Sequence, residues 1–390
     1  MNKELLNPDI QNFINKNLKE DPTKLILKGS SFLNVTIQEI VEQIIAKNKC
    51  KKKLSTWFQT ENIYYPNKLN IEQTSSEITA KYKANLVSGN SIIDITGGFG
   101  VDSYAFAEKF KEITHCEINS DLSSIAKHNF NALGVDNVSF IKESGLDHMN
   151  KVNKKYDWIY ADPSRRNDTK GKVFLLKDCL PNIPINLNHL FDYSDHILIK
   201  TSPVLDISSA VIELDFVKEI HVIAVQNEVK EVLYLLKKNY KGIIQFKTIN
   251  INKGKNQFFN FNISDEDITY SFPLKYLYEP NAAIMKSGGF SEVSILLNIS
   301  KLHLHSHLYT SNELREFPGR RFKILQNISY NRKLIKKLIL TKKANITTRN
   351  FPETVAQIRK KTSLKEGGDV YLFFTTDQKE NHIVLICEKV

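Results

Sequence analysis

The sequence predicts an α/β protein built on a mostly parallel, doubly wound sheet, with a helical N-terminal domain and small α/β modules at its C-terminal end. Three observations support this prediction. Apolar residues recur at helical spacing early in the chain, short apolar strands alternate with helices from about residue 89, and a second α/β pattern follows from residue 322. Alternating strands and helices favour a parallel sheet, whose ligands bind beyond the carboxyl ends of the strands.

These changes of pattern divide the 390-residue chain into four predicted parts. They are a helical domain over 1–88, the sheet domain over 89–270, a small module over 271–322 and a second module over 323–390. In the helical domain, Thr36 can cap the start of one helix. Thr74 and Glu77 have capping-box spacing, which predicts that another helix starts at Thr74.

In the sheet domain the predicted strands are short and apolar, and they cover residues 91–95, 112–117, 138–141, 156–161, 196–200 and 219–225. Helices are expected over 101–110 and 121–133. From residue 322 the expected order is strand, helix (331–343), strand, helix (352–361) and a closing hairpin. The last part therefore reads as a compact α/β unit of its own.

Composition argues against several classes of protein. A hydrophobic content of 41% is incompatible with a fully disordered or collagen-like chain. The sequence contains no run of about 18 apolar residues that would span a membrane, and its polar start lacks the core of a signal peptide. Its four cysteines form no CxxC pair. We therefore expect a cytoplasmic protein with neither a metal centre nor a membrane partner.

The positive charge is concentrated in the last third of the chain. Residues 271–390 carry 20 Lys and Arg against 10 Asp and Glu, whereas residues 1–270 carry 34 against 33. Such an excess suits an anionic partner such as nucleic acid, but it also describes a solvated basic surface. The basic amphipathic helix expected over 331–343 has apolar residues along one side. It could lie on an anionic membrane, although the flanking strands favour an integrated domain.

A glycine-rich turn follows the first strand of the sheet domain. Asp94, Gly98 and Gly100 fit the pattern D-x-x-x-G-x-G between a strand and a helix, and Gly97 adds a third glycine. Glycine allows tight turns and a close approach of the backbone to a ligand. The dinucleotide pattern G-x-G-x-x-G is not met, because Ser103 occupies its third position. Asp94 suits a ligand with a cationic amino group.

Acidic residues follow the next two strands. Glu117 ends a strand 23 residues after Asp94, where a carboxylate can accept both hydroxyls of a ribose. Alone, it could equally be an ordinary exposed acid. After the third strand, either Glu143 or Ser144 stands where an adenine would be met.

The fourth strand ends in Asp162-Pro163-Ser-Arg165-Arg166. Asp162 can accept a hydrogen bond in the ligand crevice, and Pro163 removes a backbone donor. The two arginines can clamp a phosphate or stack on a base. The alternative is a turn closed by a local Asp–Arg ion pair.

Together these motifs resemble the class I S-adenosylmethionine-dependent methyltransferases. They are more similar still to a bacterial subgroup with a THUMP-like C-terminal domain. The resemblance runs from about residue 60 to the end, on segments 72–77, 97–102, 162–166, 276–280, 317–320 and 349–352. It implies a Rossmann-like methyltransferase domain over 89–270, followed by ferredoxin-like and THUMP-like modules that bind RNA.

The resemblance also implies residue roles. Asp94 would bind the amino acid part of the cofactor, Glu117 the ribose, and Glu143 or Ser144 the adenine. Asp162 and Pro163 would face the methyl acceptor, next to Arg165 and Arg166. The full set of cofactor contacts implied is Gln73, Asp94, Gly97, Gly98, Gly100, Asp102, Glu117, Ile118, Glu143 and Ser144.

The reaction expected is methyl transfer to a base nitrogen in structured RNA. Amino-methylating relatives usually place an aromatic residue after Pro-Pro, whereas Ser164 and Arg165 stand here, so an arginine plane would have to stack on the base. Methylation of pyrimidine carbon 5 needs a cysteine nucleophile. Cys179 lies about a dozen residues after the motif, but the four cysteines are more typical of buried hydrophobes. The alternatives are a small-molecule methyltransferase and a non-catalytic RNA-binding protein with a vestigial fold.

Three alternating histidines form a last candidate site. On a strand, His303, His305 and His307 would share one face and could hold a metal ion. No acidic residue or cysteine adjoins them, so we favour a partly exposed strand.

Overall fold

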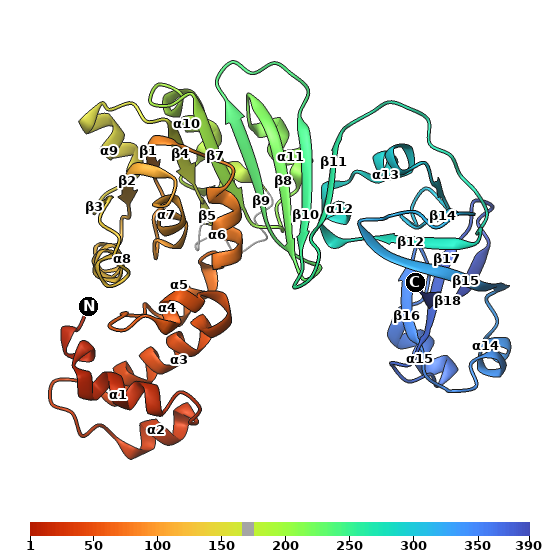
Figure 1. Cartoon of the computed structure of the whole chain (residues 1–390), viewed down its shortest axis with the longest axis horizontal. Coiled ribbons are helices and arrows are strands. Elements are labelled where there is room, and N and C mark those ends of the chain that lie inside the picture. Colours follow the sequence, from red (N-terminus) through yellow and green to blue (C-terminus); the bar gives the residue numbers. More distant parts are fainter. Residues whose placement is uncertain (166–174) are drawn as a thin grey trace. The chain divides into compact units, whose positions relative to one another are not determined.

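The computed structural model describes residues 1–165 and 175–390 (Figure 1). They divide into two compact units, residues 1–218 with 233–241, and residues 219–232 with 242–390. Strand β9 (Glu228–Lys237) contributes residues to both units. No helix in the described ranges is both long enough and apolar enough to cross a bilayer.

Helices form the N-terminal part of the first unit. They are η1 (Lys3–Leu6), α1 (Pro8–Lys16), α2 (Pro22–Lys28), α3 (Ile37–Lys53), α4 (Ser55–Gln59), α5 (Lys68–Gln73) and α6 (Glu77–Ala84). Thr36 caps α3, and it forms a reciprocal capping box with Glu39. The predicted cap at Thr74 is wrong. Thr74 ends α5, and Ser76 caps α6 by accepting a hydrogen bond from the backbone N–H of Thr79.

Five neighbouring strands of a nine-stranded sheet, in the order β7-β4-β1-β2-β3, are all parallel, and β9 lies next to β7. The strands are β1 (Gly89–Asp94), β2 (Phe110–Cys116), β3 (Val138–Ile141), β4 (Trp158–Ala161) and β7 (His196–Thr201). Ile92 and Ile93 on β1 are fully buried, as expected for a parallel strand covered on both faces. The predicted α/β fold class is confirmed, and the strands end at a common edge.

Helices and one short hairpin connect these strands. They are α7 (Val101–Phe106), α8 (Ser120–Ala132), α9 (Gly145–Val152), β5 (Ser164–Arg165), η2 (Leu176–Asp178), β6 (Cys179–Leu180), α10 (Ile183–Leu190) and α11 (Ile207–Glu213). Helix α7 ends four residues before the predicted limit, where β2 begins. The predicted site residue Arg166 lies outside the described residues. Arg165 pairs with Cys179 in the β5–β6 hairpin.

Three further strands belong mostly to the second unit. Strand β8 (Val217–Val225) is parallel to β10 (Gln245–Ile251), and β10 is antiparallel to β11 (Gln257–Asn262). Only β8 was predicted from the sequence. Phe246 on β10 and Phe261 on β11 stack with ring centroids 4.9 Å apart, which fixes the register of this pair.

A second, seven-stranded sheet has the order β13-β14-β12-β15-β18-β17-β16. Its elements, with their helices, are β12 (Tyr276–Pro280), α12 (Ala282–Ser287), α13 (Phe290–Leu297), β13 (Ser300–Lys301), β14 (Tyr309–Ser311), β15 (Gly319–Ser329), α14 (Arg332–Leu338), β16 (Asn345–Arg349), α15 (Val355–Thr362), β17 (Val370–Thr376) and β18 (His382–Lys389). The first residues of β15 pair with β12, and the rest pair with β18. Strand β15 therefore continues across residue 322, the predicted end of the first small module.

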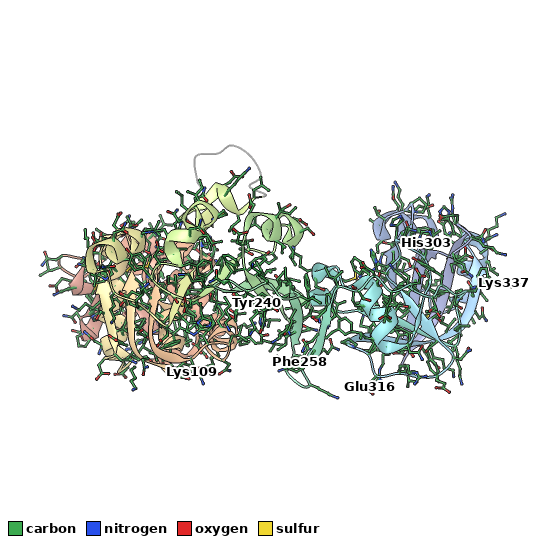
Figure 2. The ribbon with its side chains drawn as sticks, turned by 90° about the horizontal axis from the view of Figure 1, so that it is seen from above. Lys109, Tyr240, Phe258, His303, Glu316 and Lys337 are labelled. Carbon is green, nitrogen blue, oxygen red and sulfur yellow. The ribbon has the colours of Figure 1, made fainter. Side chains whose placement is uncertain are left out.

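The three histidines lie in a turn, not on the predicted strand. The backbone of His307 has φ 50°, which an extended strand does not allow. His303, labelled in Figure 2, pairs through Nε2 with Glu380 at 2.7 Å, whereas His307 stacks on Phe290. Within the described ranges, no three His, Cys, Asp or Glu side chains gather where they could hold a metal ion.

Candidate active site

A cavity of about 750 Å³ opens at the carboxyl ends of β1, β2 and β4. Its volume suits a cofactor-sized ligand. Of the residues predicted for the site, those that line it are Gln73, Asp94, Gly97, Gly98, Asp102, Glu117, Ile118, Ser144 and Asp162. Gly100, Glu143 and Pro163 are absent from the lining.

The glycine-rich turn has a backbone that only glycine adopts easily. Gly98 and Gly100 have φ angles of +56° and +86°. The N–H of Gly98 donates to Glu117 Oε2 at 2.8 Å, which ties the turn to the end of β2. A Cβ atom on Gly97 would lie 2.4 Å from the ring of His115. The turn therefore needs glycine both for its left-handed conformation and for its close packing.

Asp94 is buried at the end of β1. Its Oδ1 accepts from the N–H of Thr96 at 3.0 Å, and its Oδ2 accepts from the hydroxyl of Ser103 at 2.7 Å. Burial, together with the charges of Asp102 and Asp162, raises the pKa of Asp94 to about 7, although these hydrogen bonds lower it. A cation bound in the cavity would favour the ionised carboxylate.

Asp102 belongs to a buried polar network that the sequence did not reveal. Its Oδ2 accepts from the hydroxyls of Ser75 at 2.8 Å and Tyr160 at 2.7 Å. The ammonium of Lys83, which is fully buried, lies 3.2 Å from Oδ1. Burial alone would raise the pKa of Asp102, but the charges of Lys83 and Lys200 hold it lower than usual. Asp102 is therefore a carboxylate at neutral pH.

Glu117 is oriented by two backbone donors. Its Oε2 accepts from Gly98, and its Oε1 accepts from the N–H of Asn119 at 2.8 Å. A carboxylate has about four acceptor positions, so two remain for a diol in the cavity. Ile118, the next residue, is exposed and adds an apolar surface to the lining.

The structure separates the two candidates that follow β3. The carboxylate of Glu143 pairs with Lys151 and lies 3.2 Å from His148 Nδ1. These contacts, with Lys151 first, lower the pKa of Glu143. Ser144 lines the cavity instead. Next to it, a Cβ atom on Gly145 would lie 2.4 Å from that of Ile95, so the chain passes close to the end of β1 here.

Asp162 marks the end of β4. Its backbone N–H donates to Thr96 Oγ1 at 2.7 Å, and its Oδ2 pairs with the ammonium of Lys200 at the end of β7. Lys200 was not predicted as a site residue. Its only signal in the sequence is a lysine at the end of an otherwise apolar strand, 196–200. Further lining comes from Leu180 on β6 and Asn182 before α10.

Comparison with known proteins gives matches over the C-terminal region and over the whole chain. Residues 276–318 match a family described as a ferredoxin-like domain, and residues 319–389 match a THUMP domain-like family. A crystal structure of an inferred methyltransferase from Porphyromonas gingivalis W83 is similar, with 29% identity and a TM-score of 0.89. The match covers 100% of this chain and 98% of that one.

The chain has a class I methyltransferase fold with a THUMP-like domain.

Two curated relatives match part of this chain. A 23S rRNA (uracil(747)-C(5))-methyltransferase of Pyrococcus abyssi is 26% identical over 155 residues, which cover 39% of this chain and 32% of the relative. A protein of Leptospira interrogans, named an uncharacterized RNA methyltransferase, is 28% identical over 163 residues, or 41% and 39% of the two chains. This chain thus spans roughly a third of the length of these relatives.

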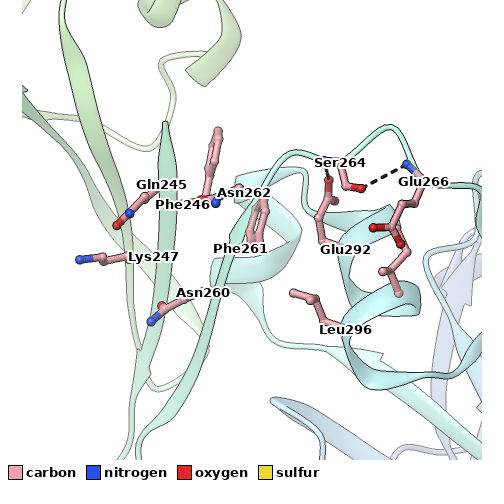
Figure 3. Close-up of a pocket in the computed structure, with 11 residues that line it drawn as sticks. Gln245, Phe246, Lys247, Asn260, Phe261, Asn262, Ser264, Glu266, Glu292 and Leu296 are labelled. Carbon is pink, nitrogen blue, oxygen red and sulfur yellow. Dashed lines mark hydrogen bonds between the residues drawn. The ribbon is translucent and has the colours of Figure 1, made fainter. Parts of the chain in front are cut away.

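A second cavity, of about 440 Å³, lies in the second unit between β10, β11 and α13. Figure 3 shows Phe261 on the side of Glu292 and Leu296, whereas Lys247 and Asn260 point the other way. Oε1 of the buried Glu292 accepts from the N–H of Ser264 at 3.3 Å. None of the predicted site residues lines this cavity.

Proposed function

We propose that this protein is an S-adenosylmethionine-dependent methyltransferase that methylates a base nitrogen in structured RNA. The observation that carries the proposal is the cavity at the strand ends. There the glycine turn, Glu117 and Asp162 follow three neighbouring strands of the sheet, β1, β2 and β4. The full-length similarity to the inferred methyltransferase of P. gingivalis supports it. The relatives named as RNA methyltransferases support RNA as the substrate.

Three carboxylates suit the charge of the cofactor. S-adenosylmethionine carries an ammonium and a sulfonium group, and it supplies the methyl group when bound. Asp94 and Asp102 offer negative charge to its amino acid end. Glu117 has acceptor positions left for the ribose hydroxyls, and Ser144 and Ile118 are available to the adenine.

Asp162 is proposed to serve the methyl acceptor. A nitrogen that carries a proton must lose it when it is methylated, and a carboxylate in hydrogen-bond reach can accept that proton. Lys200 pairs with one oxygen of Asp162, which holds the carboxylate in position. Within residues 1–165 and 175–390, the other oxygen accepts no hydrogen bond and is available to the acceptor.

The cysteines favour nitrogen over carbon 5 as the methylated atom. The P. abyssi relative is named for uracil carbon 5, a reaction that needs a cysteine thiolate. All four cysteines of this chain are buried. Burial raises the pKa of the Cys50 thiol to about 12 and also raises those of Cys116 and Cys387. Cys116 lines the cavity, but its raised pKa keeps the thiol protonated, and a protonated thiol is a poor nucleophile.

The THUMP-like domain is the proposed RNA contact. Helix α14 exposes Lys336 and Lys337, the second of which is labelled in Figure 2, while Ile335 is buried in the domain core. Lys343 is exposed beyond the helix. Exposed cations on an element that is already folded can contact phosphates, so binding loses no free energy to folding. A small-molecule substrate is the alternative that the experiment must distinguish.

The test is transfer of radiolabelled methyl groups to total RNA from a strain that lacks the protein, followed by mass spectrometry of the nucleosides. We expect one methylated nucleoside, with the methyl group on nitrogen. Asp162→Asn should abolish transfer but change cofactor affinity by no more than about threefold, because Asp162 is assigned to the acceptor. Asp147→Asn, at an exposed acid on α9 that does not line the cavity, is the matched control.

Transfer to small molecules but not to RNA would contradict the proposed substrate. A 5-methylpyrimidine product would contradict the proposed atom.

A further inference from the structure

Three sequence segments without a role in the methyltransferase cavity meet in the second unit. They contribute Glu279 on β12, Arg320 on β15 and Arg349 on β16. Arg320 Nε donates to Glu279 Oε2 at 2.6 Å, and Arg349 Nη2 donates to Glu279 Oε1 at 3.0 Å. The glutamate side chain is 5% exposed, whereas those of Arg320 and Arg349 are 41% and 31% exposed.

The curvature of the seven-stranded sheet creates this meeting. Glu279 and Arg320 are register partners on adjacent strands. Arg349 comes from β16, which is three places away from β15 in the strand order. A hydrogen bond from Arg320 to Thr347 Oγ1, 3.3 Å long, also joins the two strands. The edge strand β16 therefore lies close to the β12–β15 pair. The carboxylate of Glu279 binds both arginines.

One buried donor of this cluster lacks a partner. Within the described residues, Arg349 Nε is buried without a hydrogen bond. A buried polar atom without a partner is rare in folded proteins and calls for a ligand, an ion or water.

We propose that Arg320 and Arg349 form a binding site for one phosphate group of the RNA backbone. The naming of RNA rests on the proposed function. A planar guanidinium offers paired N–H donors that match phosphate oxygens. Glu279 fixes both side chains before the ligand arrives, which reduces the entropy lost on binding. With two cations against one anion, the cluster keeps a net positive charge.

The first arm of the test uses inorganic phosphate and the full-length protein. Thermal unfolding is measured in sodium phosphate and in sodium chloride of equal ionic strength. The wild type should be stabilised by phosphate, and Arg320→Lys and Arg349→Lys should lose this difference. Both variants keep the charge that Glu279 needs, so they should still fold. Arg315→Lys, at an exposed arginine paired with Glu313, is the matched control and should behave as the wild type.

The second arm measures filter binding of an RNA hairpin over a salt series. Arg349→Lys should weaken binding about three- to tenfold, because it loses the paired donors but keeps the charge. Arg349→Met should also lower the salt slope by about 0.7–0.9. No phosphate effect on the wild type would overturn the site. A phosphate effect with unchanged RNA binding would overturn RNA as the ligand.

Failure of the proposed function has a different signature. A protein that transfers methyl groups only to small molecules would contradict that function while leaving the phosphate measurement of the first arm unaffected.

Discussion

The cavity at the strand ends and the cluster of Arg320 and Arg349 are organised in the same way, with the charges reversed. In the cavity, Lys83 is fully buried and pairs with Asp102, which lines the ligand space. In the second unit, Glu279 is buried and pairs with Arg320 and Arg349, whose side chains reach solvent. In both places one enclosed ion of opposite sign fixes the groups that would meet the ligand.

The two regions differ in how far the groups that would meet the ligand are removed from water. Asp94 and Asp102 are both buried, so their charges are poorly solvated and depend on protein partners. The two arginines are partly hydrated and keep their charge without help. We therefore expect the cavity to be more sensitive than the arginine pair to loss of its buried ion.

The largest effect is expected from Lys83→Met. It leaves buried Asp102 without its ion-pair partner, which should lower the free energy of unfolding by about 3–5 kcal/mol. Lys81→Met on the same helix is the control, because Lys81 is exposed, and it should change that free energy by less than about 0.5 kcal/mol. Urea unfolding measures both. Equal free energies of unfolding for the two variants would show that the buried ion Lys83 does not explain the difference between the two regions.

A second test separates positioning from folding in the cavity. Lys200→Met should lower kcat about 100-fold, since a misplaced Asp162 no longer meets the acceptor correctly. Affinity for S-adenosylhomocysteine should change by less than about threefold, because Lys200 pairs with the residue assigned to the acceptor. Lys109→Met, at an exposed lysine, is the control. Steady-state kinetics with calorimetry decide the matter, and an unchanged kcat would contradict the role.

Glu279→Gln should cost less than Lys83→Met. The arginines left behind are 41% and 31% exposed, so water can solvate them. We expect the free energy of unfolding to fall by about 1–2 kcal/mol. The control is Glu313→Gln, at a side chain that is 77% exposed. A loss as large as that of Lys83→Met would show that exposure does not explain the difference between the regions.

The smallest effect is a pH dependence set by Asp94. Its pKa of about 7 lies above the usual 3.8, so its contribution to stability falls as the pH rises from about 4 to 7. The ammonium group of S-adenosylhomocysteine needs the ionised carboxylate, whose fraction rises from about a tenth at pH 6 to about nine tenths at pH 8. Affinity for S-adenosylhomocysteine should therefore rise roughly tenfold over this range.

Other groups near Asp94 should not titrate over that range. The pKa of Asp102 is lowered, and burial lowers that of His115 to about 4. Calorimetric titration of Asp94→Asn should show no such rise. A rise that persists in this variant would assign the pH dependence to another group.

Much of the fold could be predicted because local patterns encode it. Strands such as β1 are short apolar runs, and Thr36 with Glu39 specifies a helix start through contacts within four residues. The turn at Gly98 and Gly100 was also visible, since its positive φ angles favour glycine. The Thr74 prediction was wrong because Ser76, two residues on, offers an equivalent hydroxyl. The sequence pattern alone does not show which of two nearby hydroxyl residues caps the helix.

By itself, the sequence determined the parallel strands β1 to β4 and β7, the glycine turn and the acids at the strand ends. Only the tertiary structure decided which charges meet. Lys200 reaches Asp162 across 38 positions of the chain, and Arg349 reaches Glu279 across 70. The pKa values of Asp94 and Asp102 shift in opposite directions, although both are buried aspartates. The physical reason is that charge energetics depend on distance and solvation, which the fold sets and residue spacing does not.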